Sequence, residues 1–145
     1  MTATQTTLMT VSRTVEFCAA HRLCNPAWSA AENARVYGRC SNPGGHGHNY
    51  ELSISVSGPK DPASGMIVNV TALRDVLQAE VVEQLDHRNL NTDVAFLAGV
   101  ITTMENLAEH IAARLAPRLQ ALGVRLVALT LAESDHNQVT VHFHD

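Results

Sequence analysis

A twelve-residue alternation over residues 46–57 constrains the fold more than any other feature of the sequence. One parity holds His46, His48, Tyr50, Leu52, Ile54 and Val56, and the other holds Asn49, Glu51, Ser53, Ser55 and Ser57. Successive side chains of a β-strand point to opposite faces of a sheet. The segment is therefore predicted to be a strand with one buried face and one solvent-exposed face. Such a strand must pair with others in a sheet.

Five further segments complete the predicted elements. Residues 11–21 alternate in the same way, and residues 124–133 and 139–143 form two more alternating runs with a short polar turn between them. Apolar residues at helical spacing predict helices over residues 70–85 and 102–123. The order β-β-α-α-β-β predicts an α+β domain, whose four-stranded antiparallel sheet carries both helices on one face.

The second predicted helix carries signals at its ends and in its interior. Thr102 and Glu105 match a capping-box pattern, in which the glutamate side chain serves the helix start. Gly123 is predicted to stop the helix, and Pro117 is expected to kink or divide it. Residues 86–93, which precede this helix, are predicted to form a loop.

Length and composition limit the class of protein. The 145 residues suit one domain, predicted over residues 11–145 after a polar, flexible tail over residues 1–10. The formal net charge of −4 gives no general basic field for nucleic acid, and no apolar run approaches the roughly 18 residues of a membrane span. The tail lacks the features of a secretory signal, and three cysteines, an odd number, argue against a disulfide framework. We therefore expect a reducing, cytoplasmic location.

Three histidines stand at the ends of predicted strands. His46 and His48 lie two residues apart, so both imidazoles project from one face, and His21 ends the other strand on the parity of its apolar residues. If these strands pair, three imidazoles converge at one end of the core face. Three neutral histidines commonly hold a catalytic zinc ion and leave a fourth position open. The alternative for each is an ordinary packed, hydrogen-bonded histidine.

Cys40, Asp86 and His87 are candidates for acid–base chemistry. Cys40 precedes His46 by six residues, and a thiolate is the reactive form of cysteine. A carboxylate that orients a histidine, which in turn exchanges a proton with a cysteine, is sound general-base chemistry. The alternative is that Asp86 caps a turn and His87 is solvated. Cys18, on the parity opposite to Phe17, is expected to be inert packing.

Two glutamates are candidate substrate ligands. Glu133 is expected to end an apolar face, because it shares its parity with Val127, Leu129 and Leu131. A buried carboxylate there needs hydrogen bonds, and two parallel N–H donors on a 2-amino-4-oxo pyrimidine edge would supply them. The alternative is that the strand ends one residue earlier and Glu133 is solvated. For Glu105 the alternative is the capping box.

Several motifs together resemble the 6-pyruvoyl-tetrahydropterin synthase family. They are "FCAAHRL", "YGRCSNPGGHGHNY", "SGMIVNVTALRDV", "LDHRNLN", "TTMENLA" and "LAESDHN", in the family's order and at consistent spacing. The resemblance covers roughly residues 11–143. Carried over residue by residue, it implies zinc ligands at His21, His46 and His48, a catalytic Cys40 with Asp86 and His87, and a pterin pocket with Glu133, Glu105 and Thr103. Met104 stands where the family usually has a second threonine.

The resemblance also implies an assembly and a reaction. The expected tunnelling-fold subunits form a homo-trimer, or a hexamer of two trimers, with active sites at the interfaces. The implied lyase converts 7,8-dihydroneopterin triphosphate to 6-pyruvoyl-tetrahydropterin with zinc and releases triphosphate. The sister 6-carboxy-tetrahydropterin synthase, of queuosine biosynthesis, is the alternative; it releases acetaldehyde and usually has a shorter spacing than the five residues between Cys40 and His46. A zinc hydrolase and a non-catalytic zinc- or pterin-binding protein are further alternatives.

Overall fold

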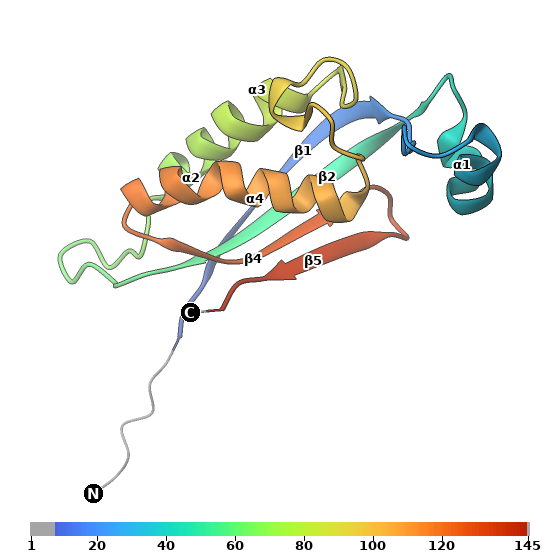
Figure 1. Ribbon diagram of the computed structural model, residues 1–145. Coiled ribbons are helices and arrows are strands. Elements are labelled where there is room, and N and C mark those ends of the chain that lie inside the picture. The colour runs from blue at the N-terminus through green and yellow to red at the C-terminus, as the bar shows by residue number, and fades with distance from the viewer. Residues whose placement is uncertain (1–7, 145) are drawn as a thin grey trace, which may run out of the picture.

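The structure is a computed structural model that describes residues 8–144 (Figure 1). Residues 8–10 are exposed and lie outside any helix or strand. Most of the predicted tail over residues 1–10 falls outside the described residues. The chain then runs through a sheet and several helices, which together form an α+β fold as predicted.

One sheet with the strand order β3-β1-β2-β4-β5 forms the base of the fold. Its strands are β1 (Val11–His21), β2 (His46–Ser57), β3 (Arg88–Asn89), β4 (Arg125–Ala132) and β5 (Gln138–His142). The four long strands pair antiparallel, which confirms the predicted four-stranded arrangement for this part of the sheet. The alternation of the sequence matches the burial, because Leu52, Ile54 and Val56 are fully buried on the covered face.

A fifth strand corrects the predicted strand count. Residues 86–93 were predicted to be a loop, but Arg88 and Asn89 form β3 and pair parallel with Ala19 and Ala20 of β1. The backbone N–H of Leu90 donates to the Ala20 carbonyl oxygen at 2.8 Å. A two-residue strand has no side-chain period to detect, so its pairing comes from backbone hydrogen bonds that sequence alternation does not report.

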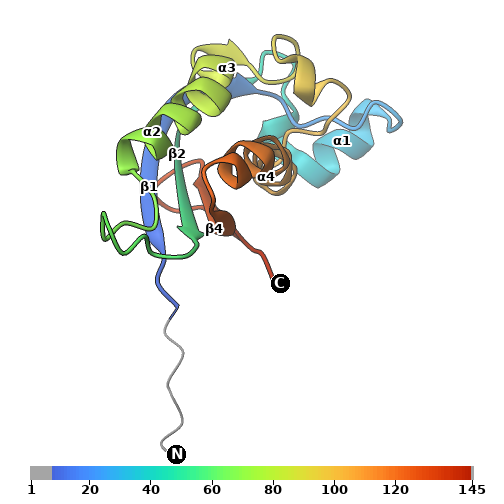
Figure 2. The same cartoon turned by 90° about the vertical axis from the view of Figure 1, so that its left-hand side faces the viewer.

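Two helical segments cover one face of the sheet, as predicted (Figures 1 and 2). The first consists of α2 (Val70–Leu77), a π-helical turn (Gln78–Val82) and α3 (Glu83–Leu85), and the second is α4 (Met104–Ala121). Between helices and sheet lies the apolar core, whose fully buried members include Leu52, Ile54, Leu73, Leu77, Leu107 and Ile111. No helix within residues 8–144 combines the length and the apolar character that crossing a membrane requires.

The start of α4 differs from the prediction, and the helix is continuous past Pro117. Thr103, not Thr102, is the N-cap, and its hydroxyl accepts a hydrogen bond from the backbone N–H of Asn106. The capping-box position therefore falls on Asn106, and Glu105 is left exposed in the first turn. Pro117 does not divide the helix: it lies on the exposed side, while Leu115 and Leu119 anchor both sides of it in the core.

A small lobe stands apart from the other helices at the end where β1 stops and β2 begins (Figure 1). It contains α1 (Ala30–Tyr37), capped by the Ser29 hydroxyl, and a 3-10 turn (Gly38–Ser41). The buried Asn33 side chain holds the lobe together, because its amide accepts from Asn25 N–H at 2.8 Å and donates to the Asn25 carbonyl oxygen at 3.0 Å. Sequence periodicity did not indicate this helix, since its eight residues bury only Asn33.

A bulge in β4 shifts the predicted parity of that strand. Ser55 faces Ala128 and Val56 faces Leu126, so Val127 is the extra residue. Leu126 and Leu129 are buried and Val127 is only half-buried, contrary to the predicted inward set of Val127, Leu129 and Leu131. The parity beyond the bulge is as predicted, because Leu129 and Leu131 are fully buried.

Candidate metal centre and active site

Strand register brings three histidines together at one end of the covered face. His21 is the direct partner of His46 across β1 and β2, and His48 faces Ala19, two residues before His21. The ring centroids lie 4.7 Å apart for His21 and His46, 5.2 Å for His21 and His48, and 4.8 Å for His46 and His48. One candidate ligand nitrogen from each ring lies within 4.8 Å of the other two.

The buried ring of His21 is oriented by a backbone contact. Its Nδ1 lies 2.8 Å from the Thr102 carbonyl oxygen, and its Nε2 lies 3.1 Å from His46 Nε2. Because a carbonyl only accepts, Nδ1 carries the proton, and the lone pair of Nε2 points toward the other histidines. Burial lowers the pKa of His21 to about 4. The hydrogen bond with Thr102 opposes this shift, and the neighbouring His46 and His48 rings lower the pKa by smaller amounts. The ring is therefore neutral at pH 7, as a metal ligand must be.

The environment of His48 distinguishes a metal site from a cluster of ordinary packed histidines. Its Nε2 is buried and has no hydrogen-bond partner among residues 8–144. Burial lowers the pKa of His48, although the nearby Glu133 carboxylate opposes the shift. A buried, neutral ring nitrogen without a partner is unusual unless another group completes it. The 3.1 Å between the His21 and His46 nitrogens is close to the roughly 3.3 Å that separates two ligands of a tetrahedral ion. The three residues thus fit a metal ion.

Glu133 lies beside this cluster. It follows β4 directly, and its carboxylate Oε2 is 3.8 Å from His48 Nε2. Its side chain is 21% exposed, so the carboxylate is mostly covered but accessible from one side. The strand ends at Ala132, one residue before Glu133, as the alternative supposed, yet Glu133 is not fully solvated. The backbone N–H of Glu133 donates to the Asn137 carbonyl oxygen at 3.1 Å and continues the pairing.

Tyr50 is a site residue that sequence analysis did not single out. It shares the face of His46 and His48, is 1% exposed, and stacks on Phe17 with centroids 4.9 Å apart. Its hydroxyl has no hydrogen-bond partner among the described residues. Burial first, and the Glu133 charge second, raise the pKa of Tyr50 well above its usual range. Its parity with the two histidines was the available signal.

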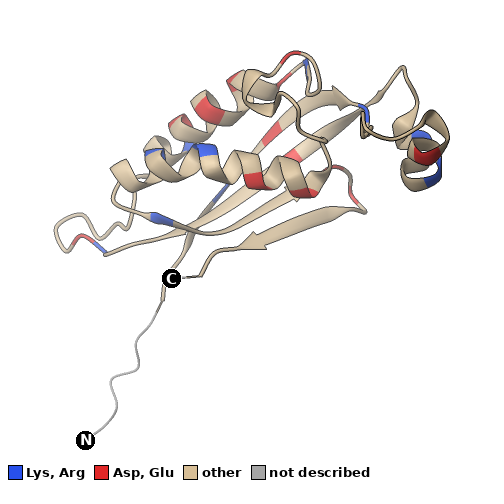
Figure 3. Cartoon of the chain, viewed as in Figure 1, with Lys and Arg blue, Asp and Glu red and all other residues tan. Residues whose placement is uncertain are grey.

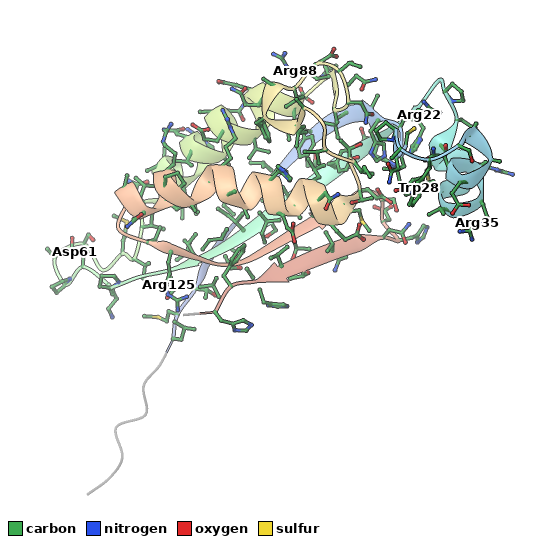
Figure 4. The ribbon with its side chains drawn as sticks, in the orientation of Figure 1. Arg22, Trp28, Arg35, Asp61, Arg88 and Arg125 are labelled. Carbon is green, nitrogen blue, oxygen red and sulfur yellow. The ribbon has the colours of Figure 1, made fainter. Side chains whose placement is uncertain are left out.

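Cys40 lies in the 3-10 turn of the small lobe and is half-buried. Two hydrogen bonds tie this turn to the residues that directly follow His21. The backbone N–H of Leu23 donates to the Cys40 carbonyl oxygen at 2.8 Å, and Arg22 Nε–H donates to the Ser41 carbonyl oxygen at 2.7 Å. Figure 4 shows Arg22 at the base of the lobe. The position of Cys40 is thus fixed relative to the end of β1.

Asp86 and His87 form a pair with each other. Asp86 Oδ2 accepts from His87 Nδ1 at 2.8 Å, and Asp86 Oδ1 accepts from the backbone N–H of Cys18 at 2.8 Å. The Cys18 hydrogen bond, followed by that of His87, lowers the pKa of Asp86. The His87 side chain is 81% exposed, and its backbone has a positive φ of 58°. Within residues 8–144 no hydrogen bond joins the Cys40 thiol to either residue.

Cys18 and the first residues of α4 differ from their expected environments. Cys18 is exposed rather than packed, and its backbone holds the Asp86–His87 turn. Thr103 caps α4, Met104 packs partly against the core, and Glu105 is exposed, which removes the capping-box role considered for it. These residues follow Thr102, whose carbonyl oxygen orients His21. This role of Thr102 was missed, because a backbone acceptor leaves no mark in the sequence.

Comparison with known proteins gives consistent matches over nearly the whole chain. A family model described as 6-pyruvoyl tetrahydropterin synthase matches residues 10–143. The 6-pyruvoyl tetrahydrobiopterin synthases of Pongo abelii and Homo sapiens are 42% and 40% identical over 129 residues, which is 89% of this chain and 88% of each relative. The structure of Caenorhabditis elegans 6-pyruvoyl tetrahydropterin synthase matches with a TM-score of 0.85 and 33% identity, covering 95% of this chain and 97% of that one.

Proposed function

The chain belongs to the 6-pyruvoyl tetrahydropterin synthase family, and from this premise we propose that it is a zinc-dependent lyase acting on 7,8-dihydroneopterin triphosphate. The product is 6-pyruvoyl-tetrahydropterin, and inorganic triphosphate is released. The observation that carries the proposal is the buried His48 Nε2, which has no hydrogen-bond partner in the described part of the chain, lies next to two other ring nitrogens and is 3.8 Å from the Glu133 carboxylate.

His21, His46 and His48 are the residues that would hold the zinc ion. When bound, zinc supplies Lewis acidity to the hydroxyl oxygens of the substrate's side chain. The role of the protein is to hold the three imidazoles in place, and His21 is the best fixed, through Thr102. A set of three histidines would leave a coordination position open for substrate, unlike a closed cysteine-rich structural site.

Glu133 is the proposed anchor for the pterin ring. Its carboxylate is mostly covered and lies beside His48, so a ring that it binds has its substituents next to the triad. Two oxygens of one carboxylate can accept two parallel N–H donors, which the amino and ring N–H groups of a pterin offer. Thr103 and Glu105, in the first turn of the helix that follows Thr102, are the further proposed substrate contacts.

Cys40 is the proposed proton carrier at the side-chain carbons of the substrate, with His87 as its acid–base partner. Asp86 holds the proton on His87 Nδ1, so that Nε2 is the nitrogen able to exchange protons. Within one chain Asp86 accepts a hydrogen bond from the backbone of Cys18, and the His87 side chain is largely exposed. We therefore assign Cys40 and the Asp86–His87 pair of one active site to different subunits.

A closed homo-oligomer, a trimer or a hexamer of two trimers, is the proposed assembly. Within the described residues, β5 pairs only with β4, and β1 pairs outward with β3 at Ala19 and Ala20 alone. Such unpaired strand edges are normally covered, and pairing between copies closes them. A cytoplasmic location is proposed because the three cysteines, Cys18, Cys24 and Cys40, are all free.

Product analysis tests the proposal directly. The zinc-loaded protein is incubated with 7,8-dihydroneopterin triphosphate without oxygen, and the products are identified by mass. We expect 6-pyruvoyl-tetrahydropterin and triphosphate. A 6-carboxy-tetrahydropterin with acetaldehyde would instead assign the protein to the sister activity. Absence of turnover with zinc bound would overturn the enzymatic proposal and favour a binding protein.

A further inference from the structure

A cavity of about 310 Å³ opens beside the metal centre, past the end of β1. Its walls include Arg22, the Pro43–Gly45 turn and Asn89. Arg22 directly follows the candidate ligand His21, and Gly45 directly precedes His46. No acidic side chain among residues 8–144 lines the cavity, although the chain has a net charge of −4. Figure 3 shows that basic residues elsewhere are scattered over the described chain and not gathered on one face.

Arg22 is a half-buried cation that has no counter-charge within the described residues. Its Nε–H is used by the Ser41 carbonyl oxygen, but no hydrogen bond within residues 8–144 involves Nη1 or Nη2, and no carboxylate lies within 4.0 Å. Arg35, Arg74, Arg114 and Arg118, by contrast, all pair with carboxylates. Covering a charge without a partner is unfavourable, and the two outer nitrogens of a guanidinium match the oxygens of a phosphate.

Other uncommitted donors line the same cavity. The Asn89 side-chain amide nitrogen donates to no group in the described chain, and no hydrogen bond there involves the backbone N–H of Gly44. Asn91, also in the wall, is fully occupied by Arg22 and Thr102 and fixes the position of the Arg22 backbone. The cavity therefore presents one cation and several N–H donors, with no negative side chain. This combination suits a polyanion.

The order of groups along β2 suggests which polyanion. Glu133 lies nearest to His48, and the strand runs from Tyr50 through His48 and His46 to the glycine turn at the cavity. A substrate with its ring at Glu133 and its hydroxyl groups at the triad therefore points its far end toward Gly44 and Arg22. We propose that this cavity binds the triphosphate group, with the Arg22 guanidinium as its main contact. The inference rests on the proposed function.

The test separates binding of triphosphate from support of the Cys40 turn. For the zinc-loaded enzyme, KM is measured with 7,8-dihydroneopterin triphosphate, and Ki is measured for phosphate-free 7,8-dihydroneopterin as a competitive inhibitor. In Arg22→Gln we expect KM to rise at least tenfold while Ki changes less than twofold. Arg22→Lys, which keeps the positive charge, should recover part of the loss. Arg35→Gln, an exposed arginine of the same lobe (Figure 4), should leave both constants unchanged.

Equal changes in KM and Ki, or no change in either, would overturn the assignment of Arg22 to triphosphate. If the wild-type protein shows no turnover, the proposed function is wrong, but the anion site can still be tested. Binding of inorganic tripolyphosphate is then measured by calorimetry. Binding by the wild type that weakens at least tenfold in Arg22→Gln still supports an anion site. Equal binding by both proteins removes it.

Discussion

His21 and Thr102 are 81 positions apart in the sequence and are joined by a 2.8 Å hydrogen bond from the ring Nδ1–H to the backbone carbonyl oxygen. This contact links the end of β1 to the start of α4. It occupies one ring nitrogen and turns the other toward His46, at 3.1 Å. The geometry of the triad therefore depends on the packing of a helix against the sheet, as well as on the pairing of β1 with β2.

The buried state of His21 predicts how the metal-free protein responds to acid. The pKa of His21 is lowered in the folded chain to about 4, from an unfolded value near 6.5. Between these values the unfolded chain binds a proton that the folded chain does not, so stability falls as the pH drops from 6.5 to 4 and is highest above 6.5. Thermal unfolding in the presence of a chelator, measured across this range, should show the decline. A His21→Gln variant, which cannot titrate there, should show a flatter profile; an equally steep one would contradict the assignment.

His48→Ala should remove the metal. Its Nε2 is the buried nitrogen without a partner among residues 8–144, so the variant lacks one of the three proposed ligands. We expect zinc affinity to fall by at least about 100-fold, more than the loss for an outer-shell change. Metal content after dialysis is the measurement. His142→Ala, an exposed histidine of β5, is the matched control and should keep its zinc. Stoichiometric zinc in His48→Ala would count against the triad.

Cys40→Ala should keep the metal and lose turnover. The thiol lies in the lobe and not among the three ring nitrogens, so zinc content should equal that of the wild type. We expect kcat to fall about 10²- to 10⁴-fold, the usual contribution of a proton-transferring group. Cys18→Ala is the control: Asp86 is held by the backbone of Cys18, so losing that exposed thiol should not matter. Full activity of Cys40→Ala would remove the thiol from the mechanism.

Tyr50→Phe should leave the metal-free protein at least as stable as the wild type. The hydroxyl is buried and makes no hydrogen bond in the described chain, so its removal loses no contact and relieves desolvation. We expect the free energy of unfolding to stay the same or to rise by about 1 kcal/mol. Urea denaturation measures it. A Tyr50→Leu variant, which also loses the stacking on Phe17, should be destabilised. A clear loss of stability in Tyr50→Phe would show that the hydroxyl has a partner after all.

The sequence predicted the strands, the helices and the side-chain faces that follow from a two-residue or a helical period. The shared parity of His46 and His48, and the end position of His21, follow from the strand period, and their convergence follows once β1 pairs with β2. The features that were missed depend on single backbone contacts. β3 is two residues long, the bulge at Val127 shifts one strand by one residue, and Thr102 acts through its carbonyl oxygen. The capping-box assignment failed by one position because two threonines are adjacent, and only the structure shows that Thr103 is the cap.

Mixing two inactive variants tests whether one active site uses two subunits. Cys40→Ala and His87→Ala homo-oligomers should each be nearly inactive. Suppose that Cys40 and the Asp86–His87 pair of one site come from different chains. An active site is then intact where a His87→Ala chain supplies Cys40 and a Cys40→Ala chain supplies His87. Unfolding the two together at equal amounts and refolding them should restore activity at about a quarter of the sites. The measurement is turnover per zinc-loaded subunit, compared with each variant refolded alone. No recovery in the mixture, when wild-type protein refolds to full activity, would show that both groups act within one chain.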